Sequence, residues 1–229
     1  MRKLFVSLLA LFLVVLIPSL CAQAAETTVY LDAAAGADTN SGLTEAQAVK
    51  TIQKAYDLLK ETNGGKIVLV SDYTHTMTAS NQTIVSGDHS YEVVITGKTA
   101  ATKLIIHYAG TAYLGLRGPT TFENITMNVS GSSNMTIYGN NGGLVKIGKN
   151  VSTTSSTKLK LSAGPMKSGY NGPMSLEVNS GNWQDLFAGC YMYTLNGTGS
   201  LVMNGGSAVN VQTTYNGKHT GDLSITVNG

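Results

Sequence analysis

Short runs of alternating apolar and polar residues fill the chain after residue 66, and this two-residue period is typical of half-buried β-strands. Clusters of Gly, Asn and Ser, which favour turns, separate the runs. No helical pattern of about ten residues lies between them, which argues against a fold of alternating strands and helices. The sequence therefore predicts an all-β structure, with strands at residues 29–32, 66–70, 92–96, 103–107, 112–116, 122–129, 135–138, 144–147, 158–161, 175–179, 200–204 and 223–228.

One segment before residue 66 has the period of a helix instead. Its apolar residues recur at i, i+3, i+4 and i+7, and they are Ile52, Ala55, Tyr56 and Leu59. Thr51 is the expected N-cap, with Thr44 and Gln47 as a rival capping box one or two turns earlier. The Asn-Gly-Gly sequence at 63–65 should end the helix, because these residues tolerate the left-handed conformation of a helix C-terminus.

A weak internal repeat of about 25 residues runs through the C-terminal half of the chain. Three segments share an apolar-x-apolar-Asn pattern, and their asparagines, Asn179, Asn204 and Asn228, are separated by 25 and 24 residues. A strand-only repeat of this length favours a parallel β-helix over a propeller, whose blades need about 40 residues. Stacked coils would place the two apolar residues of each segment in a continuous interior. The three asparagines would form a structural ladder in which each side-chain amide bonds the next.

Residues 1–25 have the three parts of a secretory signal peptide. A positive start precedes an apolar run, and Ala22 to Ala24 form an A-x-A cleavage site. The apolar run is too short to span a membrane comfortably. We therefore expect cleavage near Ala24 and a secreted, extracellular or cell-surface location.

The charge balance offers no electrostatic attraction to nucleic acid or to anionic membranes. The chain has 15 basic and 13 acidic residues, and loss of Arg2 and Lys3 with the leader leaves 13 of each. Charged residues make up only 12% of the chain, which argues against disorder because disordered segments are typically highly charged. We expect no nucleic-acid partner and no membrane span after cleavage, and the sequence leaves the oligomeric state open.

Four short motifs before the long series of strands belong together: YLD (30–32), GADTNSG (36–42), KTIQKA (50–55) and GGKI (64–67). Together they resemble the N-terminal segment of right-handed parallel β-helix proteins of the pectate-lyase-like superfamily, of the secreted bacterial surface type. Members often have Pro just before the K-T-I run, where this chain has Ala48 and Val49.

The resemblance implies a single all-β domain, a right-handed parallel β-helix of about six or seven coils with one N-terminal capping helix. Residues 1–25 would be the signal peptide, 26–65 the N-terminal strand, loop and capping helix, and 66–229 the coils of the β-helix. The printed chain stops where a repeat begins to turn, so either two molecules pair through this end or the array continues. We expect the second, with the array truncated at its C-terminus.

Two features offer ligand chemistry. Trp183 and Asp185 lie within about half a coil of Tyr191 and Tyr193, and sugar rings dock on aromatic faces beside amides and carboxylates. These four residues are candidate glycan ligands, and the alternative is an aromatic cluster buried inside the coil. Separately, Asp38 and Asn40 form half of a D-x-[DN]-x-[DN]-G calcium loop. The bidentate Glu is not at the required spacing, which favours a plain turn over a Ca²⁺ site.

No catalytic residues are predicted. The lyases and hydrolases of the superfamily need converging carboxylates, yet the acidic residues beyond position 92 are only Glu123, Glu177, Asp185 and Asp222. The sequence therefore favours a non-catalytic β-helix module that binds polysaccharide or cell-surface glycan, or that serves as a structural or adhesin element. The alternative, implied by the superfamily alone, is a polysaccharide lyase or glycoside hydrolase acting on an acidic polysaccharide.

Overall fold

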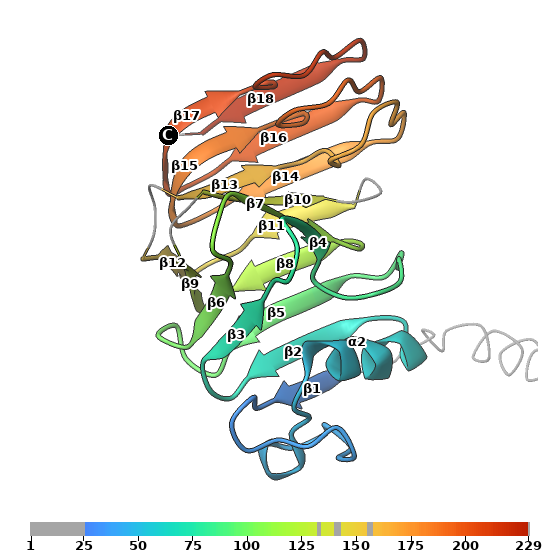
Figure 1. Ribbon diagram of the computed structural model, residues 1–229, viewed down its shortest axis with the longest axis vertical. Helices are drawn as coiled ribbons and strands as arrows, with labels where there is room; N and C mark the ends of the chain where they lie inside the picture. The colour runs from blue at the N-terminus through green and yellow to red at the C-terminus, as the bar shows by residue number, and fades with distance from the viewer. Residues whose placement is uncertain (1–25, 132–133, 140–142, 155–157, 229) are drawn as a thin grey trace, which may run out of the picture.

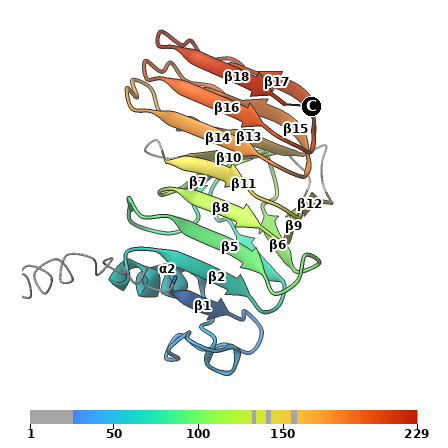
Figure 2. The ribbon, with the colours of Figure 1, turned by 180° about the vertical axis from the view of Figure 1, so that it is seen from behind.

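The computed structural model describes residues 26–131, 134–139, 143–154 and 158–228. Within these residues the chain forms a right-handed parallel β-helix of about six turns, and Figures 1 and 2 show the coils stacked along one long axis. Every strand pairing is parallel. The predicted fold class is therefore confirmed. The expected signal peptide at 1–25 lies outside the described residues.

Three parallel sheets make up the described coils, and we call them A, B and C. Sheet A contains β1 (Thr28–Leu31), β2 (Gly65–Leu69), β5 (Val93–Gly97), β8 (Thr120–Glu123), β11 (Leu144–Ile147), β14 (Met174–Val178), β16 (Gly199–Met203) and β18 (Leu223–Val227). Sheet B contains β3 (Tyr73–Thr76), β6 (Lys103–His107), β9 (Ile125–Ser130) and β12 (Val151–Thr153). Sheet C contains β4 (Asn81–Thr83), β7 (Ala112–Leu116), β10 (Met135–Gly139), β13 (Leu159–Ser162), β15 (Asn182–Phe187) and β17 (Ser207–Gln212).

Helix α2 (Ile52–Glu61) lies against β1 and β2 at the N-terminal end of the solenoid (Figure 1). The Thr51 hydroxyl accepts a hydrogen bond from the Lys54 amide at 3.2 Å, so Thr51 is the N-cap as predicted. The rival position at Thr44 precedes only a short 3-10 turn, η1 (Glu45–Gln47). All four residues of the predicted apolar stripe are buried: Ile52, Ala55, Tyr56 and Leu59. The helix thus covers apolar surface that an open coil end would leave in water.

The repeat detected in the sequence corresponds to coils stacked in register. Leu176 pairs with Leu201, which pairs with Ile225, and the apolar residues two positions further on pair in the same way. Leu176 and Leu201 are fully buried, as the predicted interior requires, and Met203 is 7% exposed. In β18 the equivalent residues are more exposed, with Val227 at 60%, because no described strand covers that edge.

The predicted strand at 122–129 is two strands in two different sheets. Asn124 separates β8 from β9 and has a φ of +47°, in the left-handed region that asparagine tolerates better than most residues. Its side-chain amide donates to the Gly97 carbonyl one coil away at 3.1 Å. This residue therefore makes the corner between sheets A and B, which a continuous β-prone sequence hides.

The coils change shape along the chain. The early coils pass through sheets A, B and C, whereas β14 leads directly to β15 and β16 leads directly to β17. Sheet B ends at β12 among the described residues, so the last coils have two sheets. Five strands were absent from the prediction: β3, β4, β12, β15 and β17. Two of these, β15 and β17, build the site described next.

Candidate functional site

A column of polar side chains crosses the outer face of sheet C. Lys160 of β13 pairs in register with Asp185 of β15, which pairs with Asn210 of β17. The neighbouring residues Leu161 and Leu186 are fully buried in the solenoid core, so alternation places the polar column on the opposite face.

Asp185 is the centre of this column. Its carboxylate accepts from Lys160 Nζ at 2.8 Å and from Asn210 Nδ2 at 2.7 Å. The side chains of Lys160 and Asp185 are only 11% and 7% exposed. Burial alone would lower the pKa of Lys160, but the hydrogen bond and the charge of Asp185 outweigh it and raise that pKa above its ordinary value. The pair is therefore held as a buried, charge-balanced unit.

Two tyrosines from the loops after β15 and β17 cover this column. Tyr191 and Tyr215 stack with their centroids 5.0 Å apart and their planes at 2°. Phe187 on β15 is fully buried beneath them and meets both rings edge-on. Its ring centroid lies 5.3 Å from that of Tyr191 and 6.5 Å from that of Tyr215. Lys160 Nζ lies 5.0 Å from the centre of the Tyr191 ring, a cation–π distance. The aromatic rings thus shield the buried ion pair from water.

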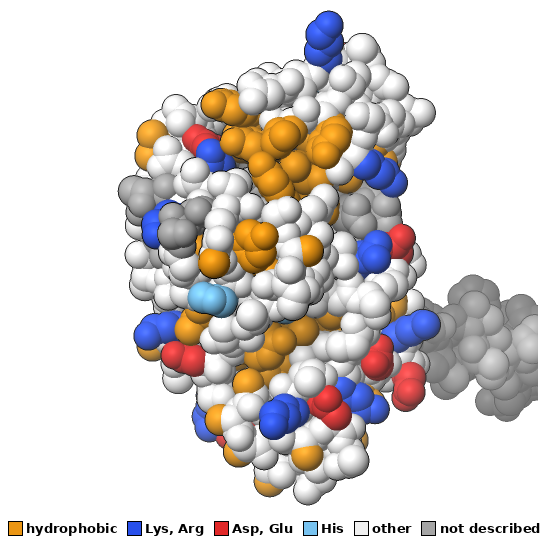
Figure 3. All heavy atoms as spheres, in the orientation of Figure 1, with side chains coloured by type: hydrophobic (Ala, Val, Ile, Leu, Met, Phe, Trp, Pro, Cys, Tyr) orange, Lys and Arg blue, Asp and Glu red, His pale blue; other side chains and the backbone are white. Residues whose placement is uncertain are grey.

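We call the outward part of this cluster the tyrosine surface: Tyr113, Tyr191, Met192, Tyr193 and Tyr215. Tyr215 is 54% exposed and Met192 is 42% exposed, whereas Tyr113, Tyr191 and Tyr193 are half-buried. Tyr113 from β7 reaches this cluster, with its hydroxyl 3.3 Å from Met192 Sδ. Figure 3 shows hydrophobic side chains gathered in a patch on this face, in the half of the molecule that contains the last coils.

The structure separates the four candidate glycan ligands. Tyr191 and Tyr193 are partly accessible, but Trp183 is only 1% exposed and Asp185 is 5% exposed. The Trp183 indole donates to the Ser180 carbonyl at 3.0 Å and packs over Gly181. Of the two alternatives that the sequence left open for Trp183, burial is the one that the structure shows. A ligand on this face would meet tyrosines and methionine, not the tryptophan.

Four residues of this site were not predicted from the sequence: Lys160, Asn210, Tyr113 and Tyr215. A spacing signal was present for three of them. Lys160, Asp185 and Asn210 follow one another at intervals of 25 residues, which is the period of the repeat. Tyr191 and Tyr215 are likewise separated by 24 residues. Residues one period apart become neighbours in a solenoid, so this spacing places them side by side.

The three ladder asparagines are bonded in series. Asn204 Nδ2 donates to Asn179 Oδ1 at 2.9 Å, and Asn228 Nδ2 donates to Asn204 Oδ1 at 2.7 Å. Asn179 begins the series, and its amide donates to Ile147 O at 3.0 Å and to Glu177 Oε1 at 2.9 Å. These side chains tie consecutive coils together at the turn after sheet A.

Asp38 and Asn40 hold the turn before α2. Asp38 accepts from the backbone amides of Lys50 and Thr51 at 2.9 Å each and from the Thr51 hydroxyl at 2.8 Å. The Asn40 amide donates to the Ala48 carbonyl at 2.9 Å. These contacts account for both side chains as turn residues. Across the described residues, no group of three or more His, Cys, Asp or Glu side chains could hold a metal ion.

The remaining acidic side chains on the sheets are paired with lysines. On sheet A, Glu123 Oε1 lies 3.3 Å from Lys66 Nζ, and Glu177 Oε1 lies 3.1 Å from Lys146 Nζ. Asp185 is on sheet C, whereas Glu123 and Glu177 share sheet A. In the described part of the chain, no helix has the length and apolar character that a membrane crossing needs.

Comparisons with known proteins give no relative. No protein-family model matches the chain, and no curated protein or solved structure matches it significantly.

Proposed function

We propose that this chain is a secreted or cell-surface module of the pectate-lyase-like type, with its leader removed near Ala24. The motifs before β2 support this proposal, because they place a Thr51-capped helix and a following strand at the N-terminal end of a parallel β-helix. The neutral charge balance of residues after the leader is compatible with a partner other than nucleic acid or an anionic membrane.

We infer further that the module is non-catalytic and binds glycan at the tyrosine surface. One observation carries this proposal: the exposed ring of Tyr215 stacks on Tyr191 directly above the buried Lys160–Asp185 pair. The stack holds Tyr215 in place, so little side-chain entropy is lost when a ligand docks on its open face. Tyrosine offers an apolar ring and a hydroxyl together, which suits a sugar ring with an apolar face and polar rim.

The pairing of the strand carboxylates with lysines favours a binding or adhesin role over catalysis. Glycoside hydrolysis needs two carboxylates that face one substrate from opposite sides. Here Glu123 and Glu177 pair with lysines on sheet A, and Asp185 pairs with Lys160 on sheet C. A carboxylate that is already paired with a cation is a poor general base at neutral pH.

A glycan-binding screen with the mature protein tests this function. We expect at least one neutral or acidic polysaccharide to bind, and Tyr215→Ala to weaken that binding about tenfold or more, as loss of a central aromatic contact does. Val209→Ala is the matched control, because Val209 lies on the same coil, is 69% exposed and is outside the tyrosine surface. If Tyr215→Ala and Val209→Ala weaken glycan binding equally, glycan does not bind at the tyrosine surface.

A second assay separates binding from catalysis. The protein is incubated with acidic polysaccharides and Ca²⁺ while ultraviolet absorbance is followed for unsaturated sugar ends, and reducing ends are measured in parallel. We expect neither signal to rise. A rise in either one that requires the folded protein would replace the binding module with a lyase or a hydrolase.

A further inference from the structure

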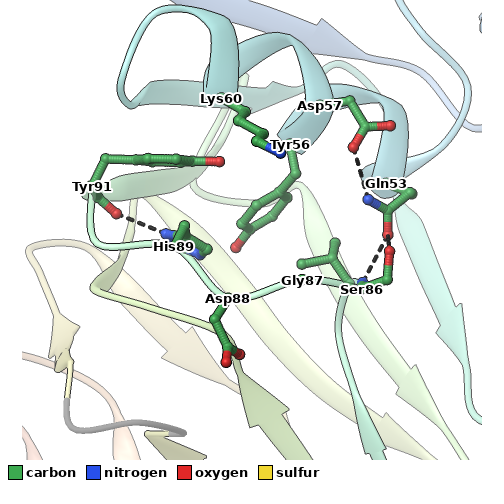
Figure 4. Close-up of a pocket in the computed structure, with 10 residues that line it drawn as sticks. Gln53, Tyr56, Asp57, Lys60, Ser86, Gly87, Asp88, His89 and Tyr91 are labelled. Carbon is green, nitrogen blue, oxygen red and sulfur yellow. Dashed lines mark hydrogen bonds between the residues drawn. The ribbon is translucent and has the colours of Figure 1, made fainter.

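A separate pocket of about 240 Å³ opens between α2 and the segment that joins β4 to β5. Figure 4 shows Tyr56 descending from α2 toward His89, with Tyr91 on one side and Gln53 and Ser86 on the other. The pocket is near the N-terminal end of the solenoid, whereas four of the five residues of the tyrosine surface, all except Tyr113, follow β15. Its volume is below the 300–1,000 Å³ of typical drug-sized sites, so it has room for one small ring.

Three aromatic rings form one wall of the pocket. His89 and Tyr91 stack with their centroids 4.6 Å apart and their planes at 25°. The Tyr56 ring is tilted against His89 at 5.4 Å. Tyr56 is 3% exposed, while His89 and Tyr91 are half-buried. The wall is therefore a fixed aromatic surface that part of a ligand ring can cover.

The facing wall is polar and held rigidly. Gln53 Nε2 donates to Asp57 Oδ1 at 2.9 Å, and Gln53 Oε1 accepts from both the amide and the hydroxyl of Ser86, at 2.8 Å and 3.0 Å. These bonds fix the distance between α2 and the β4–β5 segment. The pocket thus keeps its shape without a ligand.

The charges that line the pocket are balanced. Asp88 forms an ion pair with Arg117, in which Arg117 Nη1 lies 2.9 Å from Asp88 Oδ1. Asp57 and Lys60 carry opposite charges one turn apart on α2. Lys60 is exposed and makes no ion pair within the described residues. The rim offers an ammonium donor and carboxylate acceptors with little net charge, which suits hydroxyl groups better than a carboxylate or a phosphate.

One buried polar atom of the aromatic wall, His89 Nε2, has no hydrogen-bond partner in the described part of the chain. His89 Nδ1 lies 2.8 Å from the Tyr91 carbonyl and therefore donates to it, which leaves Nε2 as an acceptor in the neutral ring. Burial lowers the pKa of His89, so the ring is neutral at pH 7. An unpaired buried polar atom is uncommon in folded proteins, and this one belongs to a residue that lines the pocket.

From this arrangement we propose that the pocket binds one residue of a neutral pyranose sugar. The aromatic wall covers the apolar face of the ring, and the rim of Asp57, Lys60 and Asp88 bonds its hydroxyls. The proposal does not rest on glycan binding at the tyrosine surface, because the two sites share no residue.

Side-chain NMR of the histidine rings tests the proposal with methyl glucoside, methyl galactoside and methyl mannoside as probes. Sorbitol serves as an open-chain probe and methyl glucuronide as an acidic one. At least one neutral pyranoside at millimolar concentration should shift the His89 signals saturably, and the other two probes should not. Absence of any saturable shift, an equal response to sorbitol, or a response to the glucuronide alone would overturn the proposal.

Variants on α2 locate the site. Lys60→Ala and Asp57→Ala each remove one polar group from the rim, and each should weaken the affinity about tenfold, as loss of a charged hydrogen-bonding partner does. Glu61→Ala is the control, because Glu61 is exposed on the same helix but does not line the pocket. Equal affinities for Lys60→Ala, Asp57→Ala and Glu61→Ala would overturn the proposed site. Tyr215→Ala should leave this binding unchanged, which distinguishes failure here from failure of the tyrosine surface.

Discussion

Removal of Asp185 should destabilise the fold far more than removal of an exposed ion-pair partner. Lys160 and Asp185 are 11% and 7% exposed, whereas Lys98 and Glu45 form a shorter pair, at 2.6 Å, that is 49% and 45% exposed. Breaking a buried pair costs about 3–5 kcal/mol, because the remaining charge stays buried and unpaired. An exposed pair contributes about 0–1 kcal/mol. Asp185→Leu should therefore cost several kcal/mol, and Glu45→Leu should cost almost nothing.

A double variant separates the loss of the ion pair from the cost of one unpaired buried charge. Lys160→Met removes the other charge, so Lys160→Met/Asp185→Leu leaves no buried ion and should be more stable than Asp185→Leu alone. Urea unfolding followed by fluorescence is a suitable assay, because Trp183 is the only tryptophan and is buried on the same strand as Asp185. Two results would contradict this prediction: a cost for Asp185→Leu no greater than that for Glu45→Leu, or a double variant in which the losses of the two single variants simply add.

Three further predictions concern other parts of the solenoid. Gly181 and Gly87 have similar φ angles, +87° and +83°. An added Cβ would lie 2.9 Å from the Trp183 ring at Gly181 but would meet no atom within 4 Å at Gly87. Gly181→Ala should therefore lower the free energy of unfolding by about 1–3 kcal/mol more than Gly87→Ala. Thermal unfolding of the two variants checks this, and equal melting temperatures would contradict it. Asn204→Ala removes both side-chain bonds of the central ladder position and should cost about 1–2 kcal/mol. Asn204→Asp should be no more stable than Asn204→Ala, because it places a carboxylate oxygen against Asn179 Oδ1. Chemical denaturation of both variants measures this, and an Asn204→Asp variant as stable as the unmodified protein would contradict it. Burial lowers the pKa of His75, so this histidine binds a proton more readily in the unfolded chain than in the folded one. The free energy of unfolding should therefore fall by up to about 1.4 kcal/mol per pH unit as the pH drops below about 6.5. His75→Leu should reduce this slope in unfolding curves between about pH 5 and pH 8, and an unchanged slope would assign the pH dependence to other groups.

Local chemistry made much of the fold predictable from the sequence. Thr51 had the position and side chain of an N-cap, and the structure shows that it accepts the expected backbone hydrogen bond. The alternation around Leu176 and Leu201 identified the interior face, because a buried strand face must be apolar at every second residue. The repeat spacing then indicated stacked coils.

The missed elements depend on neighbours that are distant in sequence. The strand β17 reads SAVNVQ, in which the adjacent Ala208 and Val209 break the two-residue alternation, and its pairing with β15 places it in sheet C. The corner at Asn124 lies inside a β-prone run, so only the backbone conformation reveals it. The 25-residue spacing of Lys160, Asp185 and Asn210 carried the missing information, since it equals the coil length.

Hydrogen–deuterium exchange of the protein with and without a bound glycan tests the central claim most directly. We predict slower exchange in the loops that contain Tyr191 and Tyr215 when glycan is bound, with no change along the strands of sheet A. The same measurement on Tyr215→Ala should show no ligand-dependent protection in these loops. Protection confined to sheet A, or protection of the two loops that survives in Tyr215→Ala, would contradict glycan binding at the tyrosine surface.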